Sequence, residues 1–223
     1  MKTKTKALAL ALCAVLLVVS TVFVTMAFLT ARDSVQNTFT FGQVGISLDE
    51  ADVDANGEIE AGENRESTAG RVHANEYHLI PAHKYEKDPT IHVDDGSENC
   101  LLFVKLENGL KDIIASKTIE EQMKGYGWTL IDSTNNIWAY NKVVAAGEHI
   151  NVFDEFTLTE NADVSKYATE KDAQGNVTGG AFINLTAYAV QADGFIANTT
   201  AGTTVSTDDA TATWTATANS FGN

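Results

Sequence analysis

Short stretches in which apolar and polar side chains alternate recur along the chain from residue 34 onward. In VQNTFTF, Val35, Phe39 and Phe41 are apolar and the residues between them are polar, and residues 44–48 repeat this alternation. A period of two is typical of a β-strand that buries one face. The sequence therefore predicts two strands near the start of the folded part, with Gly42 permitting a bend between them.

The same alternation, or a short apolar run, predicts further strands across the rest of the chain. The connections at 94–99 (DDGSEN) and 132–136 (DSTNN) are typical of tight antiparallel turns. Many short strands joined by turns indicate an all-β protein, an antiparallel jelly-roll-like β-sandwich that forms one domain over residues 28–223. The predicted strands lie at 90–93, 101–107, 128–131, 137–140, 148–153, 155–159 and 182–190.

One or two short helices are expected beside these strands. Thr118 with Glu121 three residues later is a capping-box pattern, which predicts a helix that begins there. The tail from Asn198 is rich in Thr, Ala and Gly, and Trp214 is its one large packing residue, so no element is predicted in it.

The first 27 residues differ from the remainder. Three lysines precede an uncharged apolar run from Ala7 to Leu29, and small residues lie at Thr25 and Ala27. This pattern predicts a signal-peptide helix over 1–27 that a signal peptidase cleaves after Ala27. The run is also long enough to span a bilayer, so an uncleaved anchor stays open as an alternative.

The chain is strongly acidic, with 15 Lys and Arg against 30 Asp and Glu. Because residues 1–27 hold three lysines and no acidic residue, the remainder carries a net charge of −18. Such a charge opposes binding to nucleic acid and to anionic membrane surfaces. We therefore expect no nucleic-acid partner, and membrane contact only through the signal segment before cleavage.

Four segments, in this order, resemble the TasA/camelysin family: DSVQNTFTFGQVGISLDE, YHLIPAHKYEKDPTIHV, GSENCLLFVKLENG and INLTAYAVQADGF. The family comprises secreted proteins of Gram-positive bacteria that a SipW-type signal peptidase processes. The resemblance implies an extracellular or cell-surface protein that builds biofilm-matrix fibres from copies of itself or from related matrix subunits. Since the chain has no catalytic motif, we expect no enzymatic activity, although camelysin has been classed as a metalloprotease.

The resemblance also implies how the fibre forms. In the family, signal-peptide removal frees an N-terminal strand that inserts into the sheet of the next subunit. On this chain the donor segment is 28–41, with Val35, Phe39 and Phe41 as its inward-facing side chains. The residues alone favour the other interpretation, in which this segment is the first strand of a monomeric sandwich, because terminal strands usually pair within their own domain. The resemblance reverses that order.

An acidic loop at 52–63 offers candidate metal ligands. Its residues fit the calcium-loop pattern D-x-[DN]-x-[DN]-G-x₅-E, in which closely spaced oxygens surround one hard cation. The helices that usually flank such a loop are not predicted here, so a solvated turn is the alternative. No other cofactor is expected, and the candidate calcium ligands are Asp52, Asp54, Asn56, Glu58 and Glu63.

Two alternative functions stay open. One is a secreted, camelysin-like metallopeptidase, and the other is a monomeric calcium-stabilised surface module. The candidate metal ligands of a peptidase are His73, His78 and His83, which are spaced five apart, with His92 and His149 further on. The chain has no H-E-x-x-H pattern, which counts against a peptidase.

Cys100 lies in an apolar run, which predicts a buried thiol.

Overall fold

The computed structural model describes residues 12–16, 43–59, 70–115, 117–167, 170–171, 177–179 and 182–221. The chain divides into two compact units, Met1–Phe41 and Gly42–Asn223. In the first unit, residues 12–16 are helical. Within the described residues, no helix has both the length and the apolar character needed to cross a membrane.

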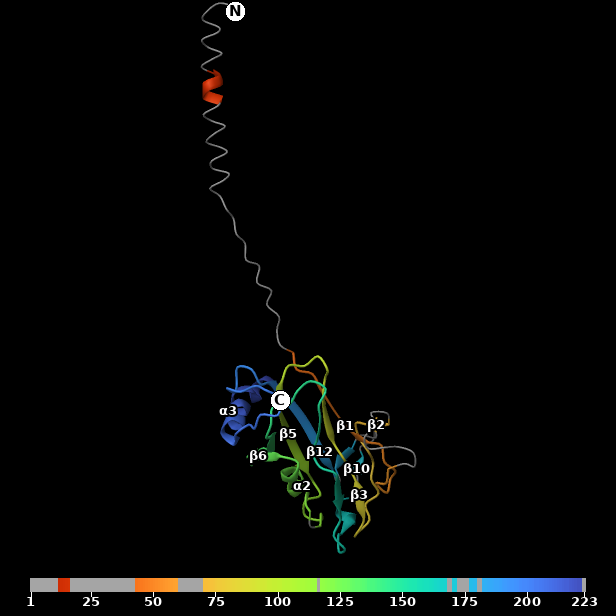
Figure 1. The fold of residues 1–223 in the computed structure, drawn as a ribbon. Helices are drawn as coiled ribbons and strands as arrows, with labels where there is room; N and C mark the ends of the chain where they lie inside the picture. Colours follow the sequence, from red (N-terminus) through yellow and green to blue (C-terminus); the bar gives the residue numbers. More distant parts are fainter. Residues whose placement is uncertain are drawn as a thin grey trace, which may run out of the picture. The chain divides into compact units, whose positions relative to one another are not determined.

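The second unit is mostly β, with antiparallel sheets and few short helices, as the alternation predicts (Figure 1). One four-stranded sheet has the order β12-β5-β7-β6, and a second has the order β2-β1-β4-β8. Two-stranded sheets are formed by β3 with β9 and by β10 with β11. The strands are β1 Ile46–Ala51, β2 Arg71–Val72, β3 Lys84–Glu86, β4 Thr90–Val93, β5 Cys100–Asn108, β6 Trp128–Asp132, β7 Ile137–Tyr140, β8 His149–Asn151, β9 Glu155–Thr157, β10 Glu170–Lys171, β11 Val177–Gly179 and β12 Ile183–Gln191.

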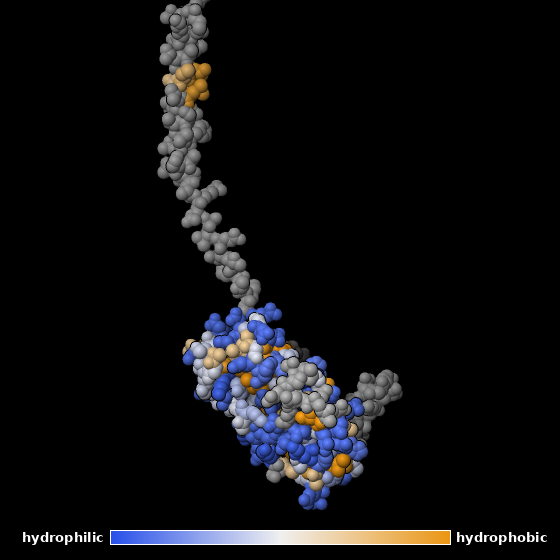
Figure 2. Space-filling model, turned by 45° about the vertical axis from the view of Figure 1, so that its right-hand side comes forward, coloured by the Kyte–Doolittle hydropathy of each residue, from blue (hydrophilic) through white to orange (hydrophobic). Residues whose placement is uncertain are grey.

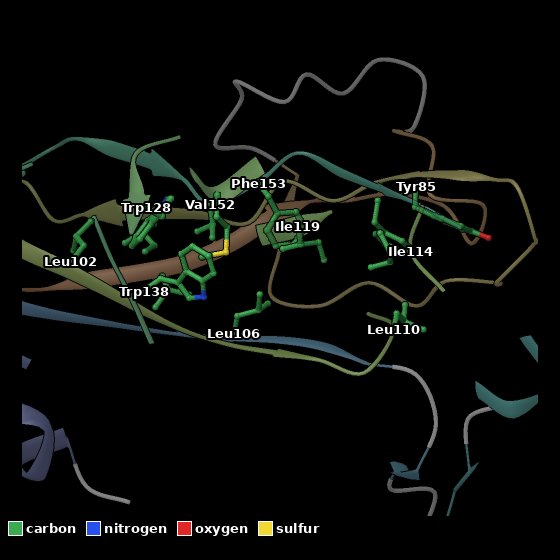
Figure 3. Packing of buried hydrophobic residues seen from close by; sticks show 14 of the residues in the cluster. Tyr85, Leu102, Leu106, Leu110, Ile114, Ile119, Trp128, Trp138, Val152 and Phe153 are labelled. Carbon is green, nitrogen blue, oxygen red and sulfur yellow. The ribbon is translucent and has the colours of Figure 1, made fainter. Parts of the chain in front are cut away.

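β5 is the centre of the fold because its two faces contact two different clusters of buried side chains. Leu102, Val104 and Leu106 face a large cluster that also contains Ile91 and Val93 of β4, so the two four-stranded sheets share one core. Figure 3 shows part of this cluster, with Trp128, Trp138, Val152, Phe153 and Ile119 gathered on one side of Leu106. A second, smaller cluster on the other face includes Leu101, Phe103, Ile137, Val190 and Ala210.

Helix α2 (Ile119–Gly125) begins where the capping box predicts. The Glu121 N–H donates to the Thr118 hydroxyl at 3.2 Å, and the Thr118 N–H donates to the Glu121 carboxylate at 2.8 Å. These two bonds satisfy N–H groups that have no partner within the helix. The buried side chains of Ile119 and Met123 then fix the helix to the main core.

Helix α3 (Thr207–Thr217) lies in the tail for which the sequence predicted no element. Ser206 caps it, accepting a hydrogen bond from the Asp209 N–H at 3.1 Å. Buried Ala210 and Thr213 anchor the helix, and the Trp214 ring lies 5.4 Å from that of Phe103. Packing on the sheet, rather than intrinsic propensity, therefore explains a helix in a threonine-rich segment. Two 3₁₀ helices, η1 (Val164–Tyr167) and η2 (Ala218–Phe221), complete the described elements.

Strand β1 extends further along the chain than the alternation of residues 44–48 predicts. It continues to Ala51, and β2 pairs with its end through Glu50↔Val72 and Ala51↔Arg71. Glu50 and Val53 are buried. Ion pairs and hydrogen bonds compensate the buried charge of Glu50.

Candidate functional site

Strand β12 is paired on one side only among the described residues. Its nine residues pair with β5 in one unbroken antiparallel register, from Ile183↔Asn108 to Gln191↔Cys100. It stands at the end of the sheet order, and no described strand pairs with its other edge. A strand of nine residues presents an edge about 30 Å long.

The register shows which backbone groups point away from β5. The Gly109 N–H donates to the Phe182 carbonyl at 2.8 Å, and the Ala192 N–H donates to the Asn99 carbonyl at 2.7 Å. In an antiparallel ladder such hydrogen-bonded pairs alternate with pairs whose N–H and C=O groups point outward. The outward groups of β12 therefore belong to the odd-numbered residues from Ile183 to Gln191.

A groove of about 1210 Å³ runs beside the first half of β12. Its walls include β1 residues 48–50 on one side and residues 182–186 on the other. Ile183 and Leu185 are half-buried and pack against the main core, as does Leu48 from β1. The groove therefore combines an open strand edge with apolar side chains at a spacing of two. Its other apolar lining residues include Leu79, Leu110, Phe156, Val164 and Phe182.

Charged and polar side chains also line the groove. Glu50 and Lys87, both nearly fully buried, form an ion pair, and the Asn75 side-chain amide donates to Glu50 at 2.9 Å. Burial and the nearby Glu50 charge raise the pKa of Tyr77 far above its ordinary value, so its hydroxyl stays protonated. The groove thus has a mixed lining, in which apolar side chains lie beside fixed polar and charged groups.

A second ion cluster holds β1 to the segment around β2. Arg71 donates to Asp49 at 2.5 Å and to Asp88 at 3.1 Å, and the Arg71 side chain is only 6% exposed. Asp88 also accepts the Ala51 N–H at 2.7 Å. Burial raises the pKa of Asp49, but hydrogen bonds from Arg71 and His92 and the positive charge of Arg71 outweigh this effect, so the pKa lies below its ordinary value. The β1 wall of the groove is consequently held by buried ionic contacts.

The predicted cleavage and donor residues lie outside the described residues. They are Ala27, Val35, Phe39 and Phe41. The described part of the chain resumes at Gln43, where its carbonyl accepts the Glu98 N–H at 3.0 Å.

Four of the five predicted calcium ligands lie within the described residues, and Glu63 does not. The Asp54 carboxylate accepts the Asn56 N–H at 2.9 Å and the Glu58 N–H at 3.0 Å. The hydrogen bond from Glu58, with those from Asn56 and Gly57, lowers the pKa of Asp54 below its ordinary value. Asp54 thus organises a tight turn, while the Asp52 side chain is exposed. The calcium site stays a prediction that depends on Glu63.

Gly57 explains why the turn has its shape. Its φ is +74°, a conformation that side chains rarely adopt, and a Cβ there would lie 2.6 Å from the Tyr85 ring. The turn therefore packs against the core through this one glycine.

The structure does not bring together the three histidines that are spaced five apart. His73 bonds to the Leu48 carbonyl at 3.0 Å, and His83 bonds to the Asn56 carbonyl at 2.7 Å. In the part of the chain that the structure describes, no three His, Cys, Asp or Glu side chains are placed to hold one metal ion. It does bring together His92 and His149, which lie 57 residues apart in the chain.

Cys100 is fully buried, as its apolar surroundings predicted. Burial, with a smaller effect from the Glu148 charge, raises the pKa of its thiol to about 12. The thiol therefore stays protonated and packs as a small apolar group.

Comparison of the chain with protein-family models finds no match, and searches against curated proteins and solved structures likewise find none.

Proposed function

We propose that this chain is a secreted structural subunit of extracellular, biofilm-matrix-type fibres, in which segment 28–41 of one copy occupies the groove beside β12 of the next. The observation that carries the proposal is the nine-residue edge of β12, which has one partner strand among the described residues and borders an apolar groove. Such an edge is a template for strand addition. The resemblance to the TasA/camelysin family supports the same assembly.

The donor segment matches the groove in period and length. Val35, Phe39 and Phe41 are separated by even intervals, so they fall on one face of an extended strand. The inward row of β12 has the same period of two at Ile183 and Leu185. Seven residues from Val35 to Phe41 extend about 23 Å, which is shorter than the roughly 30 Å edge of β12.

Burial of the Val35, Phe39 and Phe41 side chains does not by itself supply enough free energy for two copies to associate. Burying them stabilises the contact by about 5–9 kcal/mol. Association of two proteins costs about 4–15 kcal/mol in lost freedom. Main-chain hydrogen bonds along β12 and contacts between the folded units would supply the difference.

The attachment of the segment favours exchange between copies. Immediately after it, the Gln43 and Gly45 carbonyls accept the N–H groups of Glu98 and Asp94, both at 3.0 Å. The chain is thus tied to the β4 end of the sheet before β1 begins, and a segment that filled its own groove would have to reverse at Gly42. Donation to a second copy needs no such reversal, and a head-to-tail contact that does not close produces a filament.

The proposal also includes a jelly-roll arrangement of the strands and export of the chain by a signal peptide. The core shared by the two four-stranded sheets supports a jelly-roll arrangement. Residues 1–27 act as a signal-peptide helix, and cleavage after Ala27 by the signal peptidase frees the donor segment outside the cell.

Electron microscopy of the processed chain tests the proposal. We expect fibres from residues 28–223 and monomers from residues 42–223, a unit that is compact by itself. The double variant Phe39→Ser with Phe41→Ser should also stay monomeric. Its matched control, Thr38→Ser with Thr40→Ser, alters the opposite face of the same segment and should form fibres normally. Equal fibres with and without residues 28–41 would refute strand donation.

A further inference from the structure

Two histidines from neighbouring strands face each other on the second sheet. His92 of β4 is paired directly with His149 of β8, so their side chains lie on the same face. Their Nδ1 atoms are 2.6 Å apart, and their ring centroids are 4.6 Å apart. The two Nδ1 atoms are therefore directed at each other across a hydrogen bond.

A carboxylate fixes the orientation of the first ring. The Nε2 atom of His92 lies 2.7 Å from Oδ1 of Asp49, a residue of the adjacent strand β1. An ionised carboxylate only accepts hydrogen bonds, so Nε2 carries the proton and Nδ1 of the neutral ring has a free lone pair. Arg71, whose side chain is nearly buried, holds Asp49 in place at 2.5 Å.

This arrangement is the one that metal-binding histidines use. A ligating histidine almost always donates its other N–H to a carboxylate or carbonyl, which fixes the tautomer and makes the ring a stronger ligand. We propose that His92 and His149 bind one divalent transition-metal ion through their Nδ1 atoms, with Asp49 as the positioning residue. Without metal, the His149 Nδ1–H donates to Nδ1 of His92. When the ion binds, that proton is transferred through solvent to Nε2 of His149, so both rings bind the ion as neutral imidazoles.

The separation of the nitrogens changes when an ion binds. The observed 2.6 Å is the length of a hydrogen bond between the two rings. Two nitrogens at 2.0–2.1 Å from an ion are about 2.9 Å apart at a right angle and about 3.3 Å apart at a tetrahedral angle, so the rings would move apart by about 0.3–0.7 Å. Imidazole ligands suit Cu²⁺, which also has the highest affinity in the divalent series.

The site is open to incoming ions. His149 is exposed, the His92 side chain is 15% exposed, and β8 ends its sheet in the described strand order. Two protein ligands leave the other coordination positions to water. The net negative charge of the chain attracts cations to this surface.

Titration of the full chain with CuCl₂, followed by binding calorimetry and electron paramagnetic resonance, tests the proposal. We expect one Cu²⁺ per chain and a spectrum with two imidazole nitrogens. His149→Ala alters an exposed side chain, so the fold should persist while affinity falls about tenfold or more and one nitrogen signal disappears. His73→Ala removes an exposed histidine elsewhere and should change neither readout. Undiminished affinity in His149→Ala would overturn the assignment.

The substitution Asp49→Asn tests whether Asp49 orients the His92 ring rather than binding the ion itself. Loss of a hydrogen-bond partner behind a ligand lowers metal affinity about 10–100-fold. We expect this loss with both nitrogen signals retained in the spectrum at saturating Cu²⁺. An affinity equal to that of the unmodified chain would show that Asp49 does not act on the site.

Discussion

The two edge strands of the β12-β5-β7-β6 sheet differ in length, in the regularity of their register and in whether helices lie against them. β6 has five residues, its register with β7 shifts between Leu130 and Asp132, and helices α2 and α3 both lie against it. β12 has nine residues and an unbroken register with β5. Short length, register shifts and covering elements are the means by which proteins protect sheet edges from pairing with other chains. Among the described residues, this sheet thus has one protected edge and one edge without a partner strand.

The surfaces near the two edges also differ. The turn after β6 is polar, and Asp132 accepts the N–H groups of Thr134 and Asn135. The inward row of β12 borders the apolar groove. Elsewhere the surface in view is largely hydrophilic, with isolated hydrophobic patches (Figure 2). Solubility of the folded unit is therefore compatible with one strand edge that is available for assembly.

The largest effect on stability is expected in β5, the partner that gives β12 its only pairing among the described strands. Phe103 is fully buried and contacts Trp214, so Phe103→Ala should lower the free energy of unfolding by about 3–5 kcal/mol. Urea unfolding of the monomer measures this. Leu130→Ala, at a partly exposed position of β6, is the control and should cost much less. Similar losses for both would mean that β5 is not the structural centre.

A charge in the groove should distinguish the two edges most clearly. Leu185→Arg places a guanidinium where the donor segment would lie, and we expect the critical concentration for fibre formation to rise at least tenfold, equivalent to about 1.4 kcal/mol. Leu130→Arg introduces the same change at the protected edge and should leave assembly unaltered. Sedimentation of fibres at several protein concentrations measures both variants. The comparison fails if the two variants assemble alike.

A smaller effect is expected at the cap of α2, which lies against β6. Thr118→Ala removes the hydroxyl that accepts the Glu121 N–H, which should destabilise the unit by about 1 kcal/mol. Thermal unfolding gives the stability change. Because α2 lies on the protected side, fibre formation should be unchanged, and a loss of fibres would link this helix to assembly.

The smallest effect concerns acid stability at the β1 wall of the groove. The pKa of Asp49 is lowered in the folded chain, so its contribution to stability is complete above the ordinary carboxyl value of 3.8 and is lost as the pH falls through the lower folded value. Unfolding measured from pH 6 downward should show a shallower acid loss in Asp49→Asn than in the unmodified chain. Parallel curves would show that Asp49 does not contribute.

Local sequence patterns predicted the local elements well. Residues 90–93 and 137–140 form β4 and β7 with the expected bounds, and Thr118 caps α2 as its spacing with Glu121 indicates. These features depend on the period of side chains or on contacts three residues apart, which the sequence records directly.

Features that depend on distant pairing could not be predicted in this way. Helix α3 contains four threonines among residues 211–217 and no apolar stripe, and it depends on contacts with Phe103 and Tyr188. His92 and His149 meet because β4 pairs with β8, a register that alternation within either strand does not specify. Likewise, alternation in residues 183–189 predicts which face is buried but not which edge has no partner.

Amide hydrogen exchange along β12 tests strand donation most directly. In monomers of residues 42–223, the outward N–H groups of Ile183, Leu185 and Ala187 should exchange rapidly, and in fibres of residues 28–223 they should become strongly protected. The amides of β6 should change little between the two states. Rapid exchange of the three β12 amides in well-formed fibres would contradict insertion of a donor strand at this edge.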